Sequence, residues 1–141
     1  MKIRPVVAAD TEAIVALWQV VFPEYNDPSR PQRNMRSSIR RKLAVDDGLF
    51  WLAEAEGRIV GTVMAGYDGH RGWIYCFGVH PEHRRRGHGR ALLSHAEAAL
   101  AALDCPKVNL QVLASNAEAI SFWRASGYAA DEVLSFGRRL T

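Results

Sequence analysis

The stretch WIYCFGVHPEHRRRGHGRALLSHAEAALAALDCPKVNLQVL, residues 73–113, joins two apolar runs through a long segment rich in alanine and leucine. The runs at 73–79 and 107–113 predict strands, and the segment at 89–103 predicts a helix. A helix of this length allows a right-handed crossover connection. We therefore expect the two strands to run parallel in one sheet.

The rest of the chain adds an antiparallel meander and further helices. Apolar runs predict strands at 2–7, 49–55, 59–67 and 133–140. Apolar stripes predict helices at 11–21 with Asp10 as N-cap, at 33–45, and at 116–127 with Gly127 as the C-terminal glycine. The sequence thus predicts one α+β domain over residues 1–141, with a mixed, mostly antiparallel sheet and about four helices.

Composition fits an ordinary globular protein of 141 residues, 48% apolar and 23% charged. No apolar run approaches the roughly 20 residues that cross a bilayer. Asp10 and Glu12 come too early for the apolar core of a signal peptide. Cys76 and Cys105 have no paired spacing, which favours a reduced compartment. We expect a cytoplasmic protein without a membrane partner.

The junction between the strand at 73–79 and the following helix has the composition of an anion site. Gly87 and Gly89 leave the backbone open, and a helix start presents unpaired N–H groups and partial positive charge. Arginines 84, 85, 86 and 90 add charge. The glycine spacing excludes the dinucleotide fingerprint, and the absence of G-K-[ST] excludes a Walker loop. The pattern predicts a cradle for a diphosphate.

Three motifs give this chain a resemblance to a known superfamily. Residues 84–89, RRRGHG, match [RQ]-x-x-G-x-[GA], and GVHPEHR precedes them at 78–84. NAEAISFWRASGY, residues 116–128, is similar to N-x-x-A-x-x-x-Y-x-x-x-G-[FY]. The chain resembles, over nearly its whole length, the GNAT acetyltransferases, which bind acetyl-coenzyme A. GTVMAGYDGHRG, residues 61–72, resembles the narrower bacterial YpeA-like group.

The resemblance implies an N-acetyltransferase with acetyl-coenzyme A as co-substrate. The pyrophosphate would lie on the amides of Arg85, Arg86, Gly87, His88 and Gly89 and on the following helix start, and Arg84 and Arg90 would add charge. The pantetheine arm would follow Phe77, Gly78 and Val79, where the parallel strands splay, and would bond Asn116. A freed amide on that strand would polarise the thioester. A primary amine would attack directly in a ternary complex.

One residue departs from the family pattern. Trp123 stands where the resemblance implies a tyrosine that protonates the leaving thiolate, and an indole N–H does not serve as an acid. Tyr128 and Tyr75 are candidate substitutes, although core packing is an alternative explanation for Trp123 and Tyr128. Loss of the acid need not abolish activity, since coenzyme A is a tolerable leaving group.

The base and the acceptor pocket are less defined. Asp68 and His70, in the DGHRG turn, are candidate bases, and the alternative is an ordinary hairpin turn. Glu24, Tyr25 and Asp27 are candidates for the wall of an acceptor pocket, against the alternative of a solvated loop. The acceptor stays open among small amines, amino-acid derivatives, protein N-termini and lysines.

Rival interpretations use the same residues. His80, His83 and His88 lack a second spaced ligand pair, so we expect no metal and take His80 and His83 as loop residues and His88 as exposed. Nucleic acid is disfavoured because the aromatics lie in apolar segments. A module that binds or senses acetyl-coenzyme A without transfer remains an alternative. A homodimer through an exposed last strand is also open.

Overall fold

The computed structural model describes residues 1–23 and 34–140. These residues form two compact units, Met1–Leu110 and Gln111–Thr141. Within the described ranges, no helix has both the length and the apolar character needed to cross a membrane.

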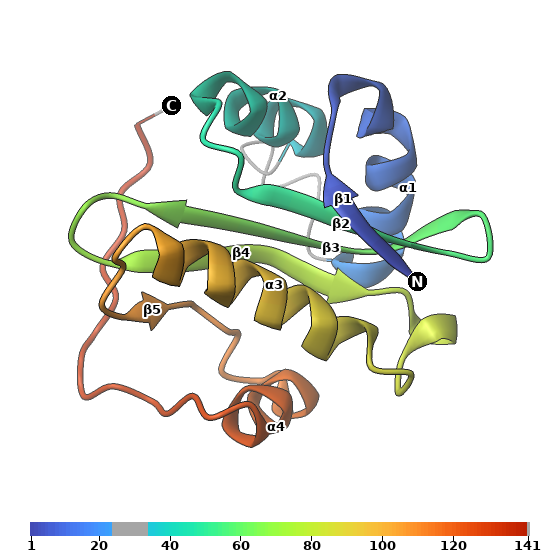
Figure 1. Ribbon diagram of the computed structural model, residues 1–141. Coiled ribbons are helices and arrows are strands. Elements are labelled where there is room, and N and C mark those ends of the chain that lie inside the picture. The colour runs from blue at the N-terminus through green and yellow to red at the C-terminus, as the bar shows by residue number, and fades with distance from the viewer. Residues whose placement is uncertain (24–33, 141) are drawn as a thin grey trace. The chain divides into compact units, whose positions relative to one another are not determined.

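The first unit is built on a five-stranded sheet (Figure 1). Its strands, in spatial and chain order, are β1 (Lys2–Pro5), β2 (Phe50–Ala55), β3 (Arg58–Tyr67), β4 (Gly72–Val79) and β5 (Val108–Asn109). The first four pair antiparallel, and β4 pairs with β5 in parallel. The expected mixed sheet with a parallel pair is confirmed.

Four α-helices occur in the described residues, as the sequence predicts. They are α1 (Thr11–Val21), α2 (Met35–Val45) and α3 (His88–Ala102) in the first unit, and α4 (Ala117–Ala125) in the second. Two short 3-10 turns, η1 (Ala8–Asp10) and η3 (Pro81–His83), precede α1 and α3.

Two glycines of the sheet show how the helices are layered. A Cβ on Gly61 would lie 2.9 Å from Leu92 of α3, whereas a Cβ on Gly78 would collide with Val21 of α1. Gly78 stands opposite Thr62, the residue after Gly61. Because successive residues of a strand point to opposite faces, α1 and α3 cover opposite faces of the sheet (Figure 1).

Each face has its own apolar core. The predicted stripe of α1 is confirmed, since Ile14, Leu17 and Trp18 are buried. They pack in a cluster with Val6, Val15, Met35, Ile39, Phe50, Leu52 and Met64. On the opposite face α3 buries Leu92, Leu93, Ala96 and Leu100. Each such large apolar side chain stabilises the fold by about 1.5–3 kcal/mol. The helix expected at 89–103 ends at Ala102, and Leu103 beyond its end is exposed.

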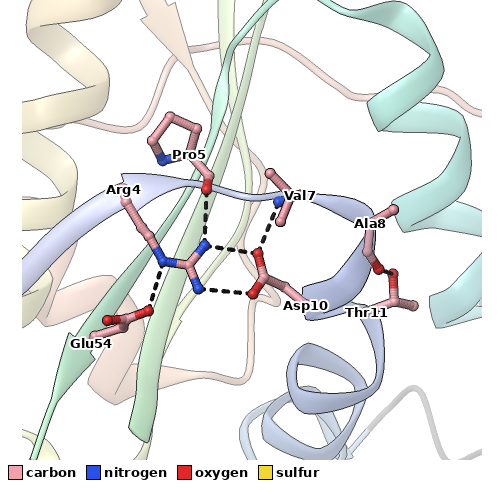
Figure 2. Close-up of polar contacts among 7 residues, drawn as sticks. All are labelled: Arg4, Pro5, Val7, Ala8, Asp10, Thr11 and Glu54. Carbon is pink, nitrogen blue, oxygen red and sulfur yellow. Dashed lines mark hydrogen bonds and ion pairs between the residues drawn. The ribbon is translucent and has the colours of Figure 1, made fainter. Parts of the chain in front are cut away.

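Asp10 occupies the expected N-cap position of α1, but its side chain bonds elsewhere. Its two carboxylate oxygens accept hydrogen bonds of 2.8 and 2.9 Å from the guanidinium of Arg4, and one of them accepts the Val7 amide at 2.9 Å (Figure 2). Arg4 also donates to Glu54 at 2.6 Å. Asp10 makes no side-chain cap bond to α1, because its oxygens hold η1 against β1 and β2 instead.

The predicted strands at 107–113 and 133–140 differ most from the structure. The strand expected at 107–113 is limited to Val108–Asn109, and the segment 133–140 is not a strand. Val133, Leu134, Phe136 and Leu140 of that segment are all at least 75% exposed. An alternating apolar pattern creates a strand only where a neighbouring strand pairs with its backbone, and the pattern does not supply the partner.

Candidate active site

The predicted cradle lies at the start of α3, after β4 and η3. Gly87 is the N-cap of α3, with φ of 83°, and no atom lies within 4 Å of the position its Cβ would take. The Ala91 amide donates to the Gly87 carbonyl at 3.1 Å. The amides of His88, Gly89 and Arg90 precede that first helical bond, so they point out of the helix end, where the dipole is positive.

The arginines of the cradle divide into two roles. Arg84 Nε donates to the Val79 carbonyl at 3.0 Å and thereby ties the turn to the end of β4. Arg86 forms a 3.6 Å ion pair with Glu56, and both side chains are more than half exposed. Arg85, at φ of 62°, and Arg90 are exposed. The cradle is therefore an open, positively charged turn in which Arg84 has a structural contact.

Of the three histidines, His80 lies in the loop after β4, as expected, whereas His88 is half-buried in the first turn of α3 rather than exposed. Nδ1 of His80 accepts the Glu82 amide at 3.1 Å and caps η3. His83 is only 3% exposed, so its expected place as a loop side chain is wrong: it packs beneath the turn, with its ring 5.9 Å from that of His80 and 6.3 Å from that of His88. Within the described residues, no three His, Cys, Asp or Glu side chains form a group that could hold a metal ion.

His88 lies inside the cradle, half-buried, with Nδ1 2.9 Å from Sδ of Met1. Burial lowers the pKa of His88, and electrostatic interactions with His83, the N-terminus and Arg86 lower this pKa further. These neighbours make the turn a place where a positive charge is disfavoured and an anion is favoured.

A β-bulge interrupts β4 just before the residues predicted to follow the pantetheine arm. Met64 of β3 pairs with Tyr75, and Thr62 pairs with Gly78, so Cys76 and Phe77 together oppose Val63. Cys76 has φ of 47°, which is uncommon for a residue with a side chain. No residue type in β4 predicts this bulge, because a bulge residue with positive φ is usually a glycine.

The parallel pair ends early along β4. The last aligned residues are Trp73 and Asn109, and β4 continues to Val79. Phe77, Gly78 and Val79 thus lie beyond the ladder with β5, on the part of β4 where the expected splay would occur. A side chain at position 78 would collide with Val21 and Phe22. Packing of α1 against the sheet therefore requires glycine at this position.

Tyr75, a candidate acid, lies on β4 and is 47% exposed. Its ring stacks with that of Trp73, with centroids 6.4 Å apart and planes 14° apart. Partial burial raises the pKa of Tyr75, and the negative charge of Asp68 raises this pKa further. The phenol therefore keeps its proton at neutral pH and can donate it.

The candidate bases Asp68 and His70 lie in the hairpin turn between β3 and β4. One carboxylate oxygen of Asp68 accepts the His70 amide at 2.7 Å and the Arg71 amide at 2.8 Å. These two amides, that of Arg71 first, lower the pKa of Asp68. Such contacts favour the turn role for Asp68, since a carboxylate with a lowered pKa is a weaker base.

The other predicted residues belong to the second unit. Oδ1 of Asn116 accepts the Ala119 amide at 3.1 Å and caps α4, a contact that leaves the side-chain NH₂ outside the cap bond. Gly127 ends the helix with φ of 92°, and its amide and that of Tyr128 bond back into the last turn. The predicted C-terminal glycine is confirmed.

Trp123 is buried within an aromatic group. Its ring lies 5.2 Å from that of Phe122 and 5.0 Å from that of Tyr128, with edge-to-face geometry in both pairs. Packing is thus a demonstrated role for Trp123. Glu24, Tyr25 and Asp27, the candidates for an acceptor pocket, lie outside the described residues.

The comparison with protein families settles which family this chain represents. The model of the acetyltransferase (GNAT) family matches residues 11–128. The chain belongs to the GNAT acetyltransferase family. An acetyltransferase of Yersinia enterocolitica is 41% identical to this GNAT enzyme over 140 residues, 99% of this chain and 96% of the relative.

Solved structures agree with the fold of this GNAT acetyltransferase. PaiA N-acetyltransferase from Thermoplasma acidophilum, in complex with coenzyme A, matches with a TM-score of 0.80 and 16% identity over 94% of this chain and 91% of that one. AAC(6')-Iy, in complex with a bisubstrate analogue of coenzyme A, matches with a TM-score of 0.75 and 18% identity over 99% and 98%. At these identities the likeness concerns the fold.

Proposed function

We propose that this acetyltransferase moves an acetyl group from acetyl-coenzyme A to a primary amine by direct attack in a ternary complex. The observation that carries the proposal is the open start of α3, where Gly87 has empty space above its backbone and the helix amides face outward. The structural neighbours bound to coenzyme A or its analogue lend support.

The residues of the cradle fit a diphosphate. Backbone amides from Arg85 to Gly89 would receive the pyrophosphate, and Arg86 and Arg90 would add charge at the surface. Gly87 allows close approach, since a larger residue there would occupy the space and strain the backbone. The pantetheine arm would follow the backbone of Phe77, Gly78 and Val79.

The acetyl group passes directly from the carrier to the amine, and the protein forms no covalent bond to it. Acetyl-coenzyme A supplies the acetyl group as a thioester. The lone pair of the deprotonated amine forms the new C–N bond, and the C–S bond breaks with its electron pair on sulfur. An amide of β4 stabilises the negative charge that develops on the carbonyl oxygen. The proton lost by the amine passes to a base or to water.

The candidate acids and bases are those expected from the sequence. Tyr128 and Tyr75 are the candidate acids, while Trp123 supplies packing. A thiol has an ordinary pKa of about 8.5, so the thiolate also leaves without a strong acid. His70 is a stronger candidate base than Asp68, whose carboxylate is held by two turn amides.

The proposal also includes the domain organisation, the cellular compartment and the class of acceptor. The family match over residues 11–128 runs across both units, which supports a single catalytic domain over residues 1–141. Cys76 and Cys105 carry free thiols, which fits a reducing cytoplasm. The acceptor amine belongs to one of the classes named from the sequence, from small amines to protein lysines.

A matched pair of glycine variants tests the cradle. Gly87→Glu should weaken acetyl-coenzyme A binding by about 10- to 100-fold in isothermal titration, through bulk and like charge against the diphosphate. Gly48→Glu is the control, because Gly48 has a similar φ of 71° and equally empty surroundings in a remote turn. Equal affinities for both variants would place the carrier elsewhere. Thiol release with a panel of amines then tests transfer.

A further inference from the structure

A buried chain of hydrogen bonds connects α1 to the bulge of β4. Nε1 of Trp18 donates to Oγ1 of Thr62 at 2.9 Å, and the same hydroxyl donates to the Cys76 carbonyl at 2.8 Å. Trp18 and Thr62 are both fully buried. Since a hydroxyl has a single proton, the bond from Trp18 leaves that proton directed at Cys76.

The chain ends on a residue with an unfavourable backbone conformation. Cys76 has a positive φ within a strand, and such a conformation persists only where the surroundings enforce it. The Thr62 hydroxyl is a direct restraint, because it holds the carbonyl of the strained residue. Thr62 itself is fixed by its place in β3, opposite Gly78.

The restraint also sets the direction of the next amide. The peptide group that joins Cys76 to Phe77 is planar and trans, so its C=O and N–H point in opposite directions. With the carbonyl directed at Thr62 of β3, the Phe77 N–H points toward the other edge of β4. That is the edge on which the ladder with β5 has already ended at Trp73.

We infer that Thr62, supported by Trp18, is a positioning residue that aims the Phe77 amide at the thioester carbonyl of bound acetyl-coenzyme A. This inference rests on the proposed function, because it assumes that the carrier lies along Phe77, Gly78 and Val79. It assigns a role in the reaction to two core side chains that contact neither substrate.

The sharpest test reads the polarisation of the carbonyl without any acceptor amine. The infrared stretch of bound acetyl-coenzyme A, labelled with carbon-13 at the thioester, should shift to lower frequency than that of the free molecule. Thr62→Val, which keeps the shape but removes the hydroxyl, should lose most of this shift. Thr62→Ser, which keeps the hydroxyl but loses a methyl group, should retain it.

Affinity and stability controls separate positioning from general damage. The Kd for acetyl-coenzyme A should change by no more than about threefold in Thr62→Val, because the cradle at α3 is untouched. Ile39→Ala, in the same core but on α2, should lower the Tm without altering the carbonyl shift. Trp18→Phe, a milder change, should weaken the shift partly and serves if Thr62→Val does not fold.

The outcomes distinguish the inference from the proposed function. An unchanged carbonyl shift in folded Thr62→Val, or a shift that follows Tm across all variants, would overturn the positioning role. Bound wild-type protein without any shift would do the same. Failure of the wild-type protein to bind acetyl-coenzyme A would instead refute the proposed function.

Discussion

Arg58 donates a 3.1 Å hydrogen bond to Nε2 of His83, a buried imidazole directly before the arginine-rich turn. Arginine has only donors, so Nε2 is the acceptor and Nδ1 carries the hydrogen. Nδ1 is buried and has no hydrogen-bond partner among the described residues. His83 thus supports the turn by packing and by one bond, at the cost of a buried donor.

His83→Phe should therefore leave stability nearly unchanged or raise it, because it removes the buried donor and keeps the ring. His83→Ala should destabilise the protein by about 2–4 kcal/mol through the cavity it leaves. Thermal unfolding of both variants measures the difference. Acetyl-coenzyme A affinity should persist in His83→Phe, and its loss would show that the imidazole contacts the carrier.

Binding of the carrier should be linked to proton uptake by His88. The pKa of His88 is lowered from its ordinary value in the free protein, and a diphosphate in the cradle should raise this pKa again. Affinity should then increase as the pH falls through about 6.5. Titrations at one pH in two buffers of different ionisation enthalpy measure the uptake. It should disappear in His88→Gln and persist in His95→Gln.

The two hydrogen bonds from Arg4 to the carboxylate of Asp10 should make the stability of the folded protein sensitive to acid. Hydrogen bonds from Arg4 lower the pKa of Asp10 in the folded state, so the stabilisation is complete above the ordinary pKa of 3.8 and is lost as the pH falls below it. Asp10→Asn should lower the Tm at neutral pH by about 3–6 °C. Its Tm should also fall less steeply than that of the wild type under acid.

Glu12→Gln is the control for this comparison. Glu12 also pairs with an arginine, Arg36, but both side chains are more than half exposed, so solvent screens the pair. Its Tm should stay within about 1 °C of the wild type. If both variants lowered the Tm equally, the hydrogen bonds between Arg4 and Asp10 would have no special role in stability.

Replacement of Trp123 tests the departure from the family pattern. Trp123→Tyr and Trp123→Phe should both retain affinity for acetyl-coenzyme A, and both should lower the Tm because the buried indole is lost. The hydroxyl is the only difference between them. If this position serves the leaving thiolate, kcat for thiol release should be about 2- to 10-fold higher for the tyrosine variant. Equal kcat values would confine the position to packing.

The sequence predicted best those elements whose signals are local. The apolar stripe of α1, the strand–helix–strand order around α3 and the terminal glycine of α4 all follow from spacing within a few residues. The turn that starts α3 was predictable for the same reason, since its glycines and arginines are adjacent in the chain.

The features that the sequence did not predict depend on which partner each group meets in the folded chain. Asp10 has the composition of an N-cap, but Arg4 and Val7 take its oxygens. Residues 133–140 have a strand pattern without a described strand partner. At the bulge, the Cys76 carbonyl accepts a hydrogen bond from Thr62, fourteen residues earlier, and no residue type in β4 predicts the bulge.

The close approach of α1 to Gly78 also limits how this enzyme could be redesigned. Any side chain added at Gly78 would strike Val21 and Phe22 rather than enter the space beyond β4. Attempts to restrict or widen the range of acyl donors by changing this residue should therefore disturb the helix first. Acyl-chain selectivity would have to be engineered from neighbouring positions whose side chains leave the sheet on its other side.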